Sequence, residues 1–366
     1  MTRRVDIAVV GAGQAGLSSG YFLQRAGLRP DDEFVVFDAD DGPGGAWRHR
    51  WPTLTFSTVH GIHQLPGMKV PVQPDPDAPV APNIARYFAD YEDTFDLRVR
   101  RPVKVISVTE DEADRLRVTT DGAGDVITRG LINATGTWRS PFWPHYPGRA
   151  DFRGRQVHTA DYPGPAPFAN RRVIVVGGGT SAIQHLMEIA GVAEHTTWVT
   201  RRPVEFTDRP FDAQRGREVE ARVARRVAQG YPPESIIAST GHQLTPQVRR
   251  AMEAGVLKRW PMFSRLTENG AQWADGTFLE ADTIVWATGF RSVLDHLRPL
   301  RLRHRNGGIA MDDTQVAADP RIHLVGYGPS ASTIGANRAA RRAVRRLRAH
   351  LGIEKRAPHA GIGVRG

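Results

Sequence analysis

The fold is decided by the stretch Val5-Asp6-Ile7-Ala8-Val9-Val10-Gly11-Ala12-Gly13-Gln14-Ala15-Gly16. Its apolar first half has the length and β-branching of a buried parallel strand, and its second half reads G-x-G-x-x-G before a helical pattern over residues 17–26. In such a motif Gly11 forms a tight turn, Gly13 lets a pyrophosphate approach the backbone, and Gly16 lets the helix pack on the strand. The stretch therefore predicts a strand–turn–helix unit that binds a dinucleotide.

An acidic residue completes this motif. A second apolar run, Phe34-Val35-Val36-Phe37, ends in Asp38, 22 residues after Gly16. A carboxylate at that place accepts hydrogen bonds from a ribose 2′-hydroxyl. Because strand, glycines, helix and acid occur in the required order, the first site is predicted to hold a dinucleotide with a free 2′-hydroxyl.

The strand–glycine–helix pattern recurs 166 residues later. The apolar run Arg172-Val173-Ile174-Val175-Val176 is followed by Gly177-Gly178-Gly179-Thr180-Ser181-Ala182, in which Ala182 replaces the third glycine. Another helical pattern extends to residue 190. Two such units in one chain predict two nucleotide sites.

The second unit carries a different 2′ selector. Its second strand, predicted over 196–200, is followed by Arg201 and Arg202 and not by an acid. Arginine can bind a phosphate through two parallel hydrogen bonds, whereas an acid would repel it. We therefore expect NADPH at this site; the alternative interpretation is two ordinary surface arginines in a chain with 45 of them.

Composition excludes several classes of protein. A length of 366 residues corresponds to about two domains, and no apolar run reaches the roughly 18 residues of a membrane span. The start also lacks a signal-peptide pattern, so a cytoplasmic protein is expected. The absence of cysteine excludes the disulfide reductases that share a two-dinucleotide plan. Although the net charge is +10, acidic residues are scattered among the arginines, so neither nucleic acid nor a membrane is expected as a partner.

A family signature lies between the two glycine motifs. Phe152-Arg153-Gly154-Arg155-Gln156-Val157-His158-Thr159-Ala160-Asp161-Tyr162 matches F-x-G-x-x-x-H-x-x-x-[FY] at every fixed position. Gly44-Gly45-Ala46-Trp47 matches a G-G-x-W that follows the first acid, and Ala134-Thr135-Gly136 and Ala287-Thr288-Gly289 match two A-T-G links. On these motifs, over nearly its whole length, the chain resembles the flavin-containing monooxygenases (class B flavoprotein monooxygenases), and in length their short bacterial members.

The resemblance implies an α/β fold with two Rossmann-like dinucleotide-binding domains, each a three-layer ββα arrangement. The NADPH domain is expected to be inserted into a discontinuous FAD domain. Residues 1–155 and 290–366 would form the FAD domain, and residues 165–289 the NADPH domain. The two A-T-G links would mark the chain crossings.

The resemblance also implies an activity. The protein would be an FAD-dependent, NAD(P)H-consuming monooxygenase whose C4a-hydroperoxyflavin oxygenates a small nucleophile. Tyr162 stands where Baeyer–Villiger enzymes carry tryptophan, which favours a sulfide or an amine over a ketone. One departure is that Ser57 or Thr58 replaces the asparagine that steadies the peroxyflavin in many members. An NAD(P)H oxidase that releases hydrogen peroxide, or a non-enzymatic flavin-binding protein, is therefore the alternative.

The candidate site residues follow from these motifs and the resemblance. Ser57, His158 and Tyr162 are the candidate catalytic residues, and the last two would position the nicotinamide half and the link between domains. The candidate cofactor-binding residues are Gly11, Gly13, Gln14, Ala15, Gly16, Asp38, Gly45, Trp47, Val105, Thr135, Gly136, Gly177, Gly179, Thr180, Ser181, Ala182, Thr200, Arg201, Arg202 and Gly289.

The remaining expectations concern the last helix, the substrate loops, metal binding and the oligomeric state. A last helix beginning near Ser332 is expected to direct its N-terminus at the flavin. Substrate contacts, with O2 as co-substrate, would come from the loops over 66–82 and 206–214. No metal site is predicted, because His60 and His63, three residues apart, lie in an expected loop. The oligomeric state stays open, with a homodimer as one candidate.

Overall fold

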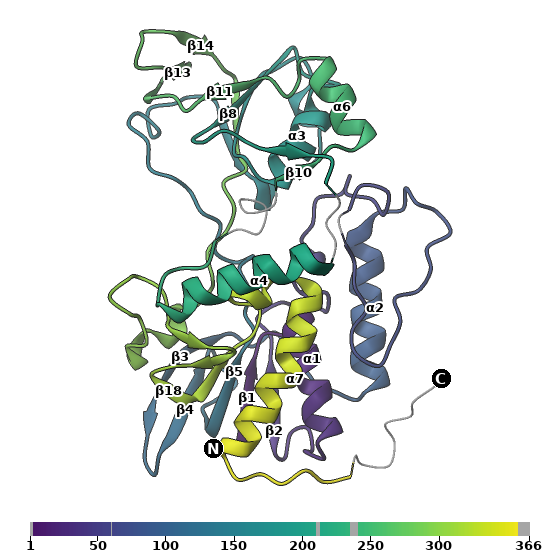
Figure 1. The fold of residues 1–366 in the computed structure, drawn as a ribbon, viewed down its shortest axis with the longest axis vertical. Helices are drawn as coiled ribbons and strands as arrows, with labels where there is room; N and C mark the ends of the chain where they lie inside the picture. The colour runs from purple at the N-terminus through teal and green to yellow at the C-terminus, as the bar shows by residue number, and fades with distance from the viewer. Residues whose placement is uncertain (1–2, 60, 210–212, 235–240, 358–366) are drawn as a thin grey trace.

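The computed structural model describes residues 3–59, 61–209, 213–234 and 241–357. The chain forms two lobes stacked along its long axis, each built on a parallel sheet (Figure 1). The two glycine motifs follow the strands Arg3–Val10 and Arg172–Val176 and lead into the helices Gln14–Arg25 and Thr180–Ile189, as the repeated pattern predicts. The predicted α/β class with two dinucleotide-binding folds is confirmed.

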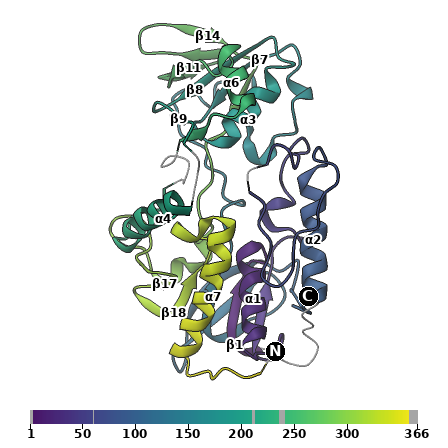
Figure 2. The same cartoon turned by 45° about the vertical axis from the view of Figure 1, so that its right-hand side comes forward.

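The lower lobe carries the first glycine motif. Its parallel strands are β18 (Asp319–Leu324), β5 (Val126–Asn133), β1 (Arg3–Val10) and β2 (Phe34–Phe37), in that spatial order. Helices α1 (Gln14–Arg25) and α7 (Thr333–His350) lie side by side against one face (Figure 2). Strands β3 (Val105–Asp111) and β4 (Arg115–Thr120) and the 3-10 helix η4 (Asp295–Leu300) share a separate apolar core with the other face. The lobe therefore has the predicted ββα layers.

The upper lobe carries the second glycine motif. Its five strands are all parallel, in the spatial order β11 (Arg259–Pro261), β8 (His195–Thr200), β7 (Arg172–Val176), β15 (Thr283–Trp286) and β6 (Arg155–His158). Helices α3 (Thr180–Ile189) and α6 (Pro246–Glu253) pack on one face. A small antiparallel sheet of β12 (Arg265–Thr267), β13 (Gly270–Gln272) and β14 (Phe278–Glu280) packs on the other.

The chain returns to the lower lobe after the upper sheet is complete. Strand β18 pairs in parallel with β5, with Ile322 opposite Leu131. Strands β16 (Met311–Asp312) and β17 (Gln315–Val316) extend this sheet beyond β18. Residues from the two ends of the chain thus share one sheet, and the upper sheet lies between them in sequence.

Two segments depart from the expected domain boundaries. Strand β6 begins at Arg155, the last residue of the expected first FAD segment, and its other residues precede the expected start of the NADPH domain at 165, yet the whole strand belongs to the upper sheet. Helix α4 (Ala213–Ala228) lies within 165–289 but packs on the lower lobe, beside η5 (Gly328–Ala331). The reason is its apolar stripe, which ends in Val227 against Gly328. Sequence position alone did not show where this stripe docks.

Helix α2 (Val80–Thr94) was not predicted and covers the segment after the G-G-x-W motif. Its start lies inside the expected loop over 66–82, and Pro82 occupies the first turn, where proline is tolerated. Tyr87 on this helix accepts from the Leu65 N–H and donates to the Met68 carbonyl. The remaining short elements are η1 (Gly45–Trp47), η2 (Thr159–Asp161), η3 (Ala166–Phe168), β9 (Phe206–Thr207) and β10 (His242–Gln243).

Candidate cofactor and active site

The first turn has the backbone that the motif requires. Gly11 has φ of +99°, and a Cβ there would lie 2.6 Å from the Ala134 carbonyl oxygen. A Cβ on Gly16 would lie 1.7 Å from the Gly11 carbonyl oxygen. Both glycines are therefore demanded by contacts within the protein, which hold α1 against the end of β1.

Gly13 is a glycine for a different reason. Its φ of −79° suits any residue, and the nearest atom to a Cβ there is the Gly45 Cα at 3.7 Å. No protein contact excludes a side chain, so an approaching ligand is what requires glycine. Gly13 also precedes the first turn of α1, which no side chain caps, leaving backbone N–H groups suited to a pyrophosphate. This cradle fits FAD.

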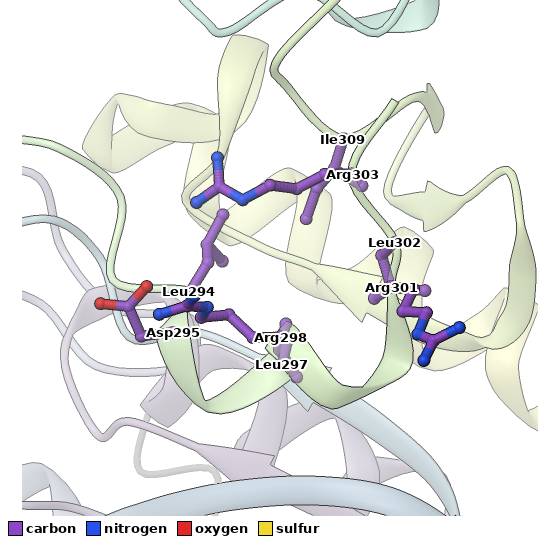
Figure 3. Close-up of a pocket in the computed structure, with 8 residues that line it drawn as sticks. All are labelled: Leu294, Asp295, Leu297, Arg298, Arg301, Leu302, Arg303 and Ile309. Carbon is purple, nitrogen blue, oxygen red and sulfur yellow. The ribbon is translucent and has the colours of Figure 1, made fainter. Parts of the chain in front are cut away.

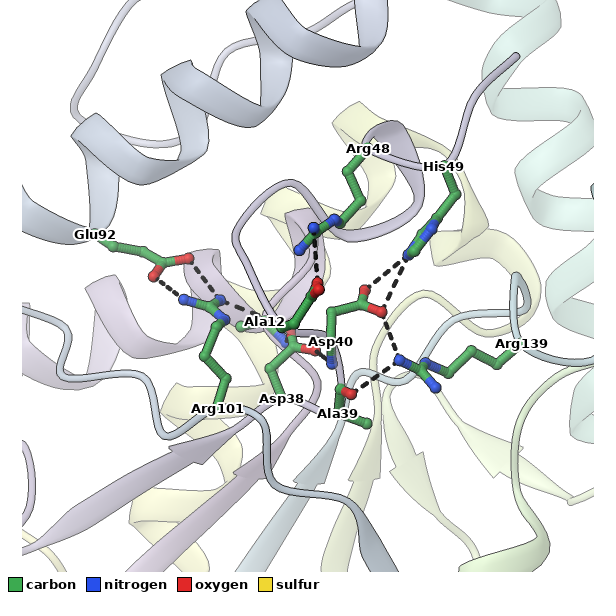
Figure 4. A network of polar contacts seen from close by, with 10 residues as sticks. Ala12, Asp38, Ala39, Asp40, Arg48, His49, Glu92, Arg101 and Arg139 are labelled. Atoms are coloured by element: carbon green, nitrogen blue, oxygen red, sulfur yellow. Dashed lines mark hydrogen bonds and ion pairs between the residues drawn. The ribbon is translucent and has the colours of Figure 1, made fainter. Parts of the chain in front are cut away.

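Asp38 stands at the end of β2 beside this turn (Figure 4). Its Oδ2 accepts from the Ala12 N–H at 2.8 Å and its Oδ1 from the Asp40 N–H at 2.9 Å. Arg101, paired with Glu92 on α2, lies 3.8 Å away and balances the carboxylate charge. Each carboxylate oxygen keeps a second lone pair, with which it can accept a hydrogen bond from a ribose hydroxyl.

Asp40 forms a second polar centre next to Asp38. It accepts from His49 at 3.0 Å and from Arg139, which follows the first A-T-G link (Figure 4). Burial acts to raise the pKa of Asp40, but the hydrogen bonds from His49 and Arg139 outweigh it and lower that pKa. Sequence reasoning missed this centre, because Arg139 lies 99 residues from Asp40 along the chain.

The remaining first-site candidates lie around the same edge. Trp47 ends η1, and Gly45 begins it; a Cβ on Gly45 would lie 2.6 Å from the Gly13 Cα. Gln14 turns its amide toward Asn337 on α7, at 2.8 Å, and not outward. Ala15 lies near Gly326 at the end of β18. Val105 is buried at the start of β3, near Asp38, whose carbonyl accepts from the Val103 N–H.

The second turn repeats the geometry of the first. Gly177 has φ of +148°, and a Cβ there would lie 2.1 Å from the Ala287 carbonyl oxygen. Gly179 again has open space where a Cβ would be, and it precedes Thr180 and Ser181 in the uncapped first turn of α3. Ala182 is fully buried against the sheet. This edge can hold a second pyrophosphate.

The selector position lies at the end of β8. The Thr200 hydroxyl donates to the Arg202 carbonyl at 2.7 Å and shapes the turn. Arg201 and Arg202 are exposed, and no ion pair within the described residues occupies either of them. His242, which the sequence did not single out, bonds the Gly178 carbonyl at 2.9 Å and steadies the glycine turn.

The two A-T-G links run antiparallel beside each other. The Thr135 hydroxyl donates to the Val293 carbonyl, and the Val293 N–H donates to the Gly136 carbonyl. Farther along, Pro141 pairs with Phe290, and the Gly289 carbonyl accepts from the Phe142 N–H. Both crossings between the lobes therefore form one hinge at the carboxyl ends of the two sheets.

His158 belongs to this hinge. Its Nε2 donates to the Gly289 carbonyl at 3.1 Å, and its Nδ1 accepts from the Ala160 N–H at 3.0 Å. Burial lowers the pKa of His158, so the ring is neutral. With both nitrogens bound to backbone, His158 ties the end of β6 to the second link and has no nitrogen left for proton transfer in this conformation.

Tyr162 and Ser57 are placed very differently. Tyr162 is buried and donates to Glu188 on α3 at 3.0 Å, and both burial and that carboxylate raise its pKa. Ser57 is exposed, and its hydroxyl donates to Asp77 at 2.9 Å. The three candidate catalytic side chains therefore do not converge on one point. Thr58, the alternative to Ser57, bonds the Thr55 backbone.

The N-terminus of α7 begins where the sequence predicts. Ser332 caps it by accepting from the Gly335 N–H at 3.0 Å. The preceding turn at Gly326 lies at the edge where α1 starts. The starts of α1 and α7 thus share the carboxyl edge of the lower sheet.

Two surface cavities lie away from these residues. One of about 520 Å³ lies beside η4 and is lined by Leu294, Asp295, Leu297, Arg298, Arg301, Leu302, Arg303 and Ile309 (Figure 3). The other, of about 560 Å³, lies where β6, β7 and β15 begin, opposite the nucleotide edge. No predicted site residue lines either cavity, so neither is the cofactor site.

Within the described ranges, no three histidine, aspartate or glutamate side chains gather as ligands. His60 lies outside the described residues. In the same part of the chain, no helix is long and apolar enough to cross a bilayer.

The chain is similar to known proteins over most of its length. The family described as pyridine nucleotide-disulphide oxidoreductase matches residues 8–326. A flavin-containing monooxygenase from Stenotrophomonas maltophilia is 37% identical, with a TM-score of 0.81, covering 96% of this chain and 100% of that one. This chain belongs to the flavin-containing monooxygenase family. It is accordingly an oxidoreductase, and its cofactors are FAD and NADPH.

More distant relatives agree with that family. An uncharacterized CzcO-like oxidoreductase of Geobacillus kaustophilus is 27% identical, over 81% of this chain and 86% of the relative. An acetone monooxygenase of Gordonia is 26% identical, over 85% of this chain and 75% of the relative. Among these relatives, only the name of the Gordonia enzyme gives a substrate, acetone.

Proposed function

We propose that this flavoprotein uses NADPH and O2 to oxygenate a small nucleophile, a sulfide or an amine before a ketone. The observation that carries the proposal is the hinge. Two uncapped glycine turns, Gly11–Gly16 and Gly177–Ala182, lie at the carboxyl edges of two sheets that antiparallel links join. Such edges are where dinucleotides bind in open parallel sheets.

We assign FAD to the lower edge and NADPH to the upper edge. Asp38 beside Gly13 suits a free ribose hydroxyl, and a 2′-phosphate there would meet a carboxylate. Arg201 and Arg202 after β8 suit the phosphate. The FAD domain would then comprise the lower sheet with its two chain segments, and the NADPH domain the upper sheet from β6 to β15, apart from α4.

The glycine turns, the links and the start of α7 would each have a separate role. The backbone N–H groups after Gly13 and Gly179 would bind the two pyrophosphates. Hydrogen bonds of His158 and Thr135 tie the two links together and so hold the two lobes in a defined relative position. The start of α7 would present its positive end to the flavin ring. Bound FAD would supply the chemistry, accepting a hydride from NADPH and activating O2.

The test is anaerobic stopped-flow spectroscopy of the purified yellow protein. NADPH should bleach the flavin absorbance within the enzyme's turnover time, and O2 should restore it. A sulfide such as thioanisole should then yield sulfoxide in proportion to the NADPH consumed. A protein that holds no flavin, or whose flavin NADPH does not reduce, would contradict the proposal.

One observation favours a second candidate function, an NAD(P)H oxidase. Ser57, one of the two candidates for the place of the stabilising asparagine, donates its hydroxyl to Asp77 at the surface. Oxygen activated at the flavin would then leave as hydrogen peroxide. The ratio of peroxide to NADPH, with and without the sulfide, separates the two functions. A cytoplasmic location and a homodimer stay predictions.

A further inference from the structure

Helix α3 of the upper lobe is fastened to the segment that follows the G-G-x-W motif of the lower lobe. Glu188, in its last turn, accepts three hydrogen bonds from outside the helix. Its Oε1 accepts from the Trp51 indole at 3.3 Å, and its Oε2 from the Thr53 hydroxyl at 2.7 Å and the Tyr162 hydroxyl at 3.0 Å. Two of these donors belong to the lower lobe, and the third ends the signature segment.

Two neighbours on the same face of α3 extend this contact. Gln184 donates to the Thr58 carbonyl at 2.9 Å. The His185 ring packs on Tyr162, with centroids 3.8 Å apart, and on Trp51 at 4.7 Å. The apolar cores on the helical faces of both sheets join here into one continuous cluster. The two lobes are thus joined a second time, on this face, besides the hinge.

The position of Glu188 argues against an incidental contact. The last turn of a helix carries partial negative charge, which disfavours a carboxylate. Three donors, two of them hydroxyls, outweigh that cost, because hydrogen bonds to a charged group are stronger than neutral ones. Burial and Glu188 both raise the pKa of Tyr162, so its hydroxyl stays protonated and donates throughout the working range of pH.

We propose that Glu188 is a positioning residue for hydride transfer. The first turn of α3 carries Gly179, Thr180 and Ser181, the candidate pyrophosphate site, and its last turn is tied to residues 51–58 of the flavin lobe. Glu188 therefore sets how far the nicotinamide reaches across the flavin. This consequence rests on the proposed function, whereas the fastening of the lobes does not.

The fastening is tested by energy transfer between two dyes. Because the chain has no native cysteine, the dyes attach only to the introduced cysteines. Ile106→Cys on β3 and Phe278→Cys on β14 place one exposed thiol on each lobe. In this background Glu188→Ala should shift or broaden the distribution of transfer efficiency. Glu253→Gln, a charge-matched change at an exposed site on α6, should leave it unchanged. An unaltered distribution in Glu188→Ala would overturn the proposal.

The consequence for hydride transfer is tested by anaerobic flavin reduction. Glu188→Ala should lower the limiting rate at saturating NADPH at least tenfold, because small misplacements of reacting groups cost that much. The dissociation constant of NADP+ should change less than threefold. A general loss of structure would instead weaken NADP+ binding together with the rate. Glu188→Gln should restore most of the rate, since its amide can accept from Trp51 and donate to the two hydroxyls.

A third variant keeps the test decisive if Glu188→Ala does not fold. Thr53→Val removes one donor at an exposed residue and should give a smaller loss in the same direction. A limiting rate equal to that of the unaltered protein in both variants overturns the positioning role. If neither NADPH nor NADH reduces the unaltered protein, the proposed function fails, and the energy-transfer result alone decides the fastening.

Discussion

At the scale of single residues, the glycines of the two motifs divide into two kinds. Gly11, Gly16 and Gly177 are fixed by protein atoms that a Cβ would meet at 2.6 Å or less. Gly13 and Gly179 have room for a Cβ and stay glycine for a ligand. The sequence motif cannot separate these roles, because every one of these positions is simply glycine in the sequence.

This division predicts opposite results for two similar substitutions. Gly13→Ala should fold with the melting temperature of the unaltered apoprotein, but its FAD dissociation constant should rise at least tenfold, because the methyl group fills the cradle. Gly16→Ala should reduce the yield of folded protein, since its methyl group would overlap the Gly11 carbonyl. Calorimetry and flavin titration measure both. Normal FAD affinity in Gly13→Ala would contradict the assignment of this turn.

The selector arginines carry a second prediction. Charge-assisted hydrogen bonds contribute about 1.5–3 kcal/mol each, so Arg201→Ala should raise the KM for NADPH about tenfold to a hundredfold, with partial exposure reducing the effect. The double variant with Arg202→Ala is the cleaner test, because one arginine can replace the other. The KM for NADH should barely change. An unchanged ratio of kcat/KM for the two coenzymes would place the selector elsewhere.

At the scale of elements, the sequence predicted those whose pattern is local. The strands β1, β2 and β7 and the helices α1, α3 and α7 follow from apolar runs, glycine turns and the Ser332 cap. Helix α2 was missed, because prolines near its start resemble a loop. The docking of α4 was missed because its partners are distant in sequence, and the Glu188 contacts were missed because Trp51 and Thr53 lie 137 and 135 residues away.

The docking of α4 gives a prediction at this scale. Val227 is buried against η5, so Val227→Ala should lower the free energy of unfolding by about 1–2.5 kcal/mol. Arg225→Ala, at an exposed position two residues earlier, should change it by less than about 0.5 kcal/mol. Urea denaturation compares the two. Equal effects would mean that α4 does not pack on the lower lobe.

At the scale of the whole molecule, three buried histidines should make the fold sensitive to acid. Burial lowers the pKa of His185 to about 3 and those of His296 and His323 to about 4. In the unfolded chain these groups bind protons near pH 6.5, so the unfolded state holds more protons below that pH. Stability is therefore complete above pH 6.5 and falls toward pH 4, by up to about 1.4 kcal/mol per pH unit for each histidine.

His185 allows this prediction to be isolated. Neither of its ring nitrogens has a hydrogen-bond partner among the described residues, so His185→Phe keeps the ring packing and removes only the titration. The slope of unfolding free energy against pH between 4 and 6 should fall by about 1.4 kcal/mol per unit. His145→Phe, at an exposed site, should leave the slope unchanged. Identical slopes in all three proteins would show that His185 is not buried.

We propose that a flavin lobe and an NADPH lobe act together as one monooxygenase, and transfer of labelled oxygen to a substrate is the decisive measurement. The purified protein is supplied with NADPH, a sulfide and ¹⁸O2, and the sulfoxide is analysed by mass spectrometry. For such a monooxygenase we predict one ¹⁸O atom in each sulfoxide and one NADPH consumed per sulfoxide formed. NADPH consumption with equimolar hydrogen peroxide and no labelled sulfoxide would contradict it.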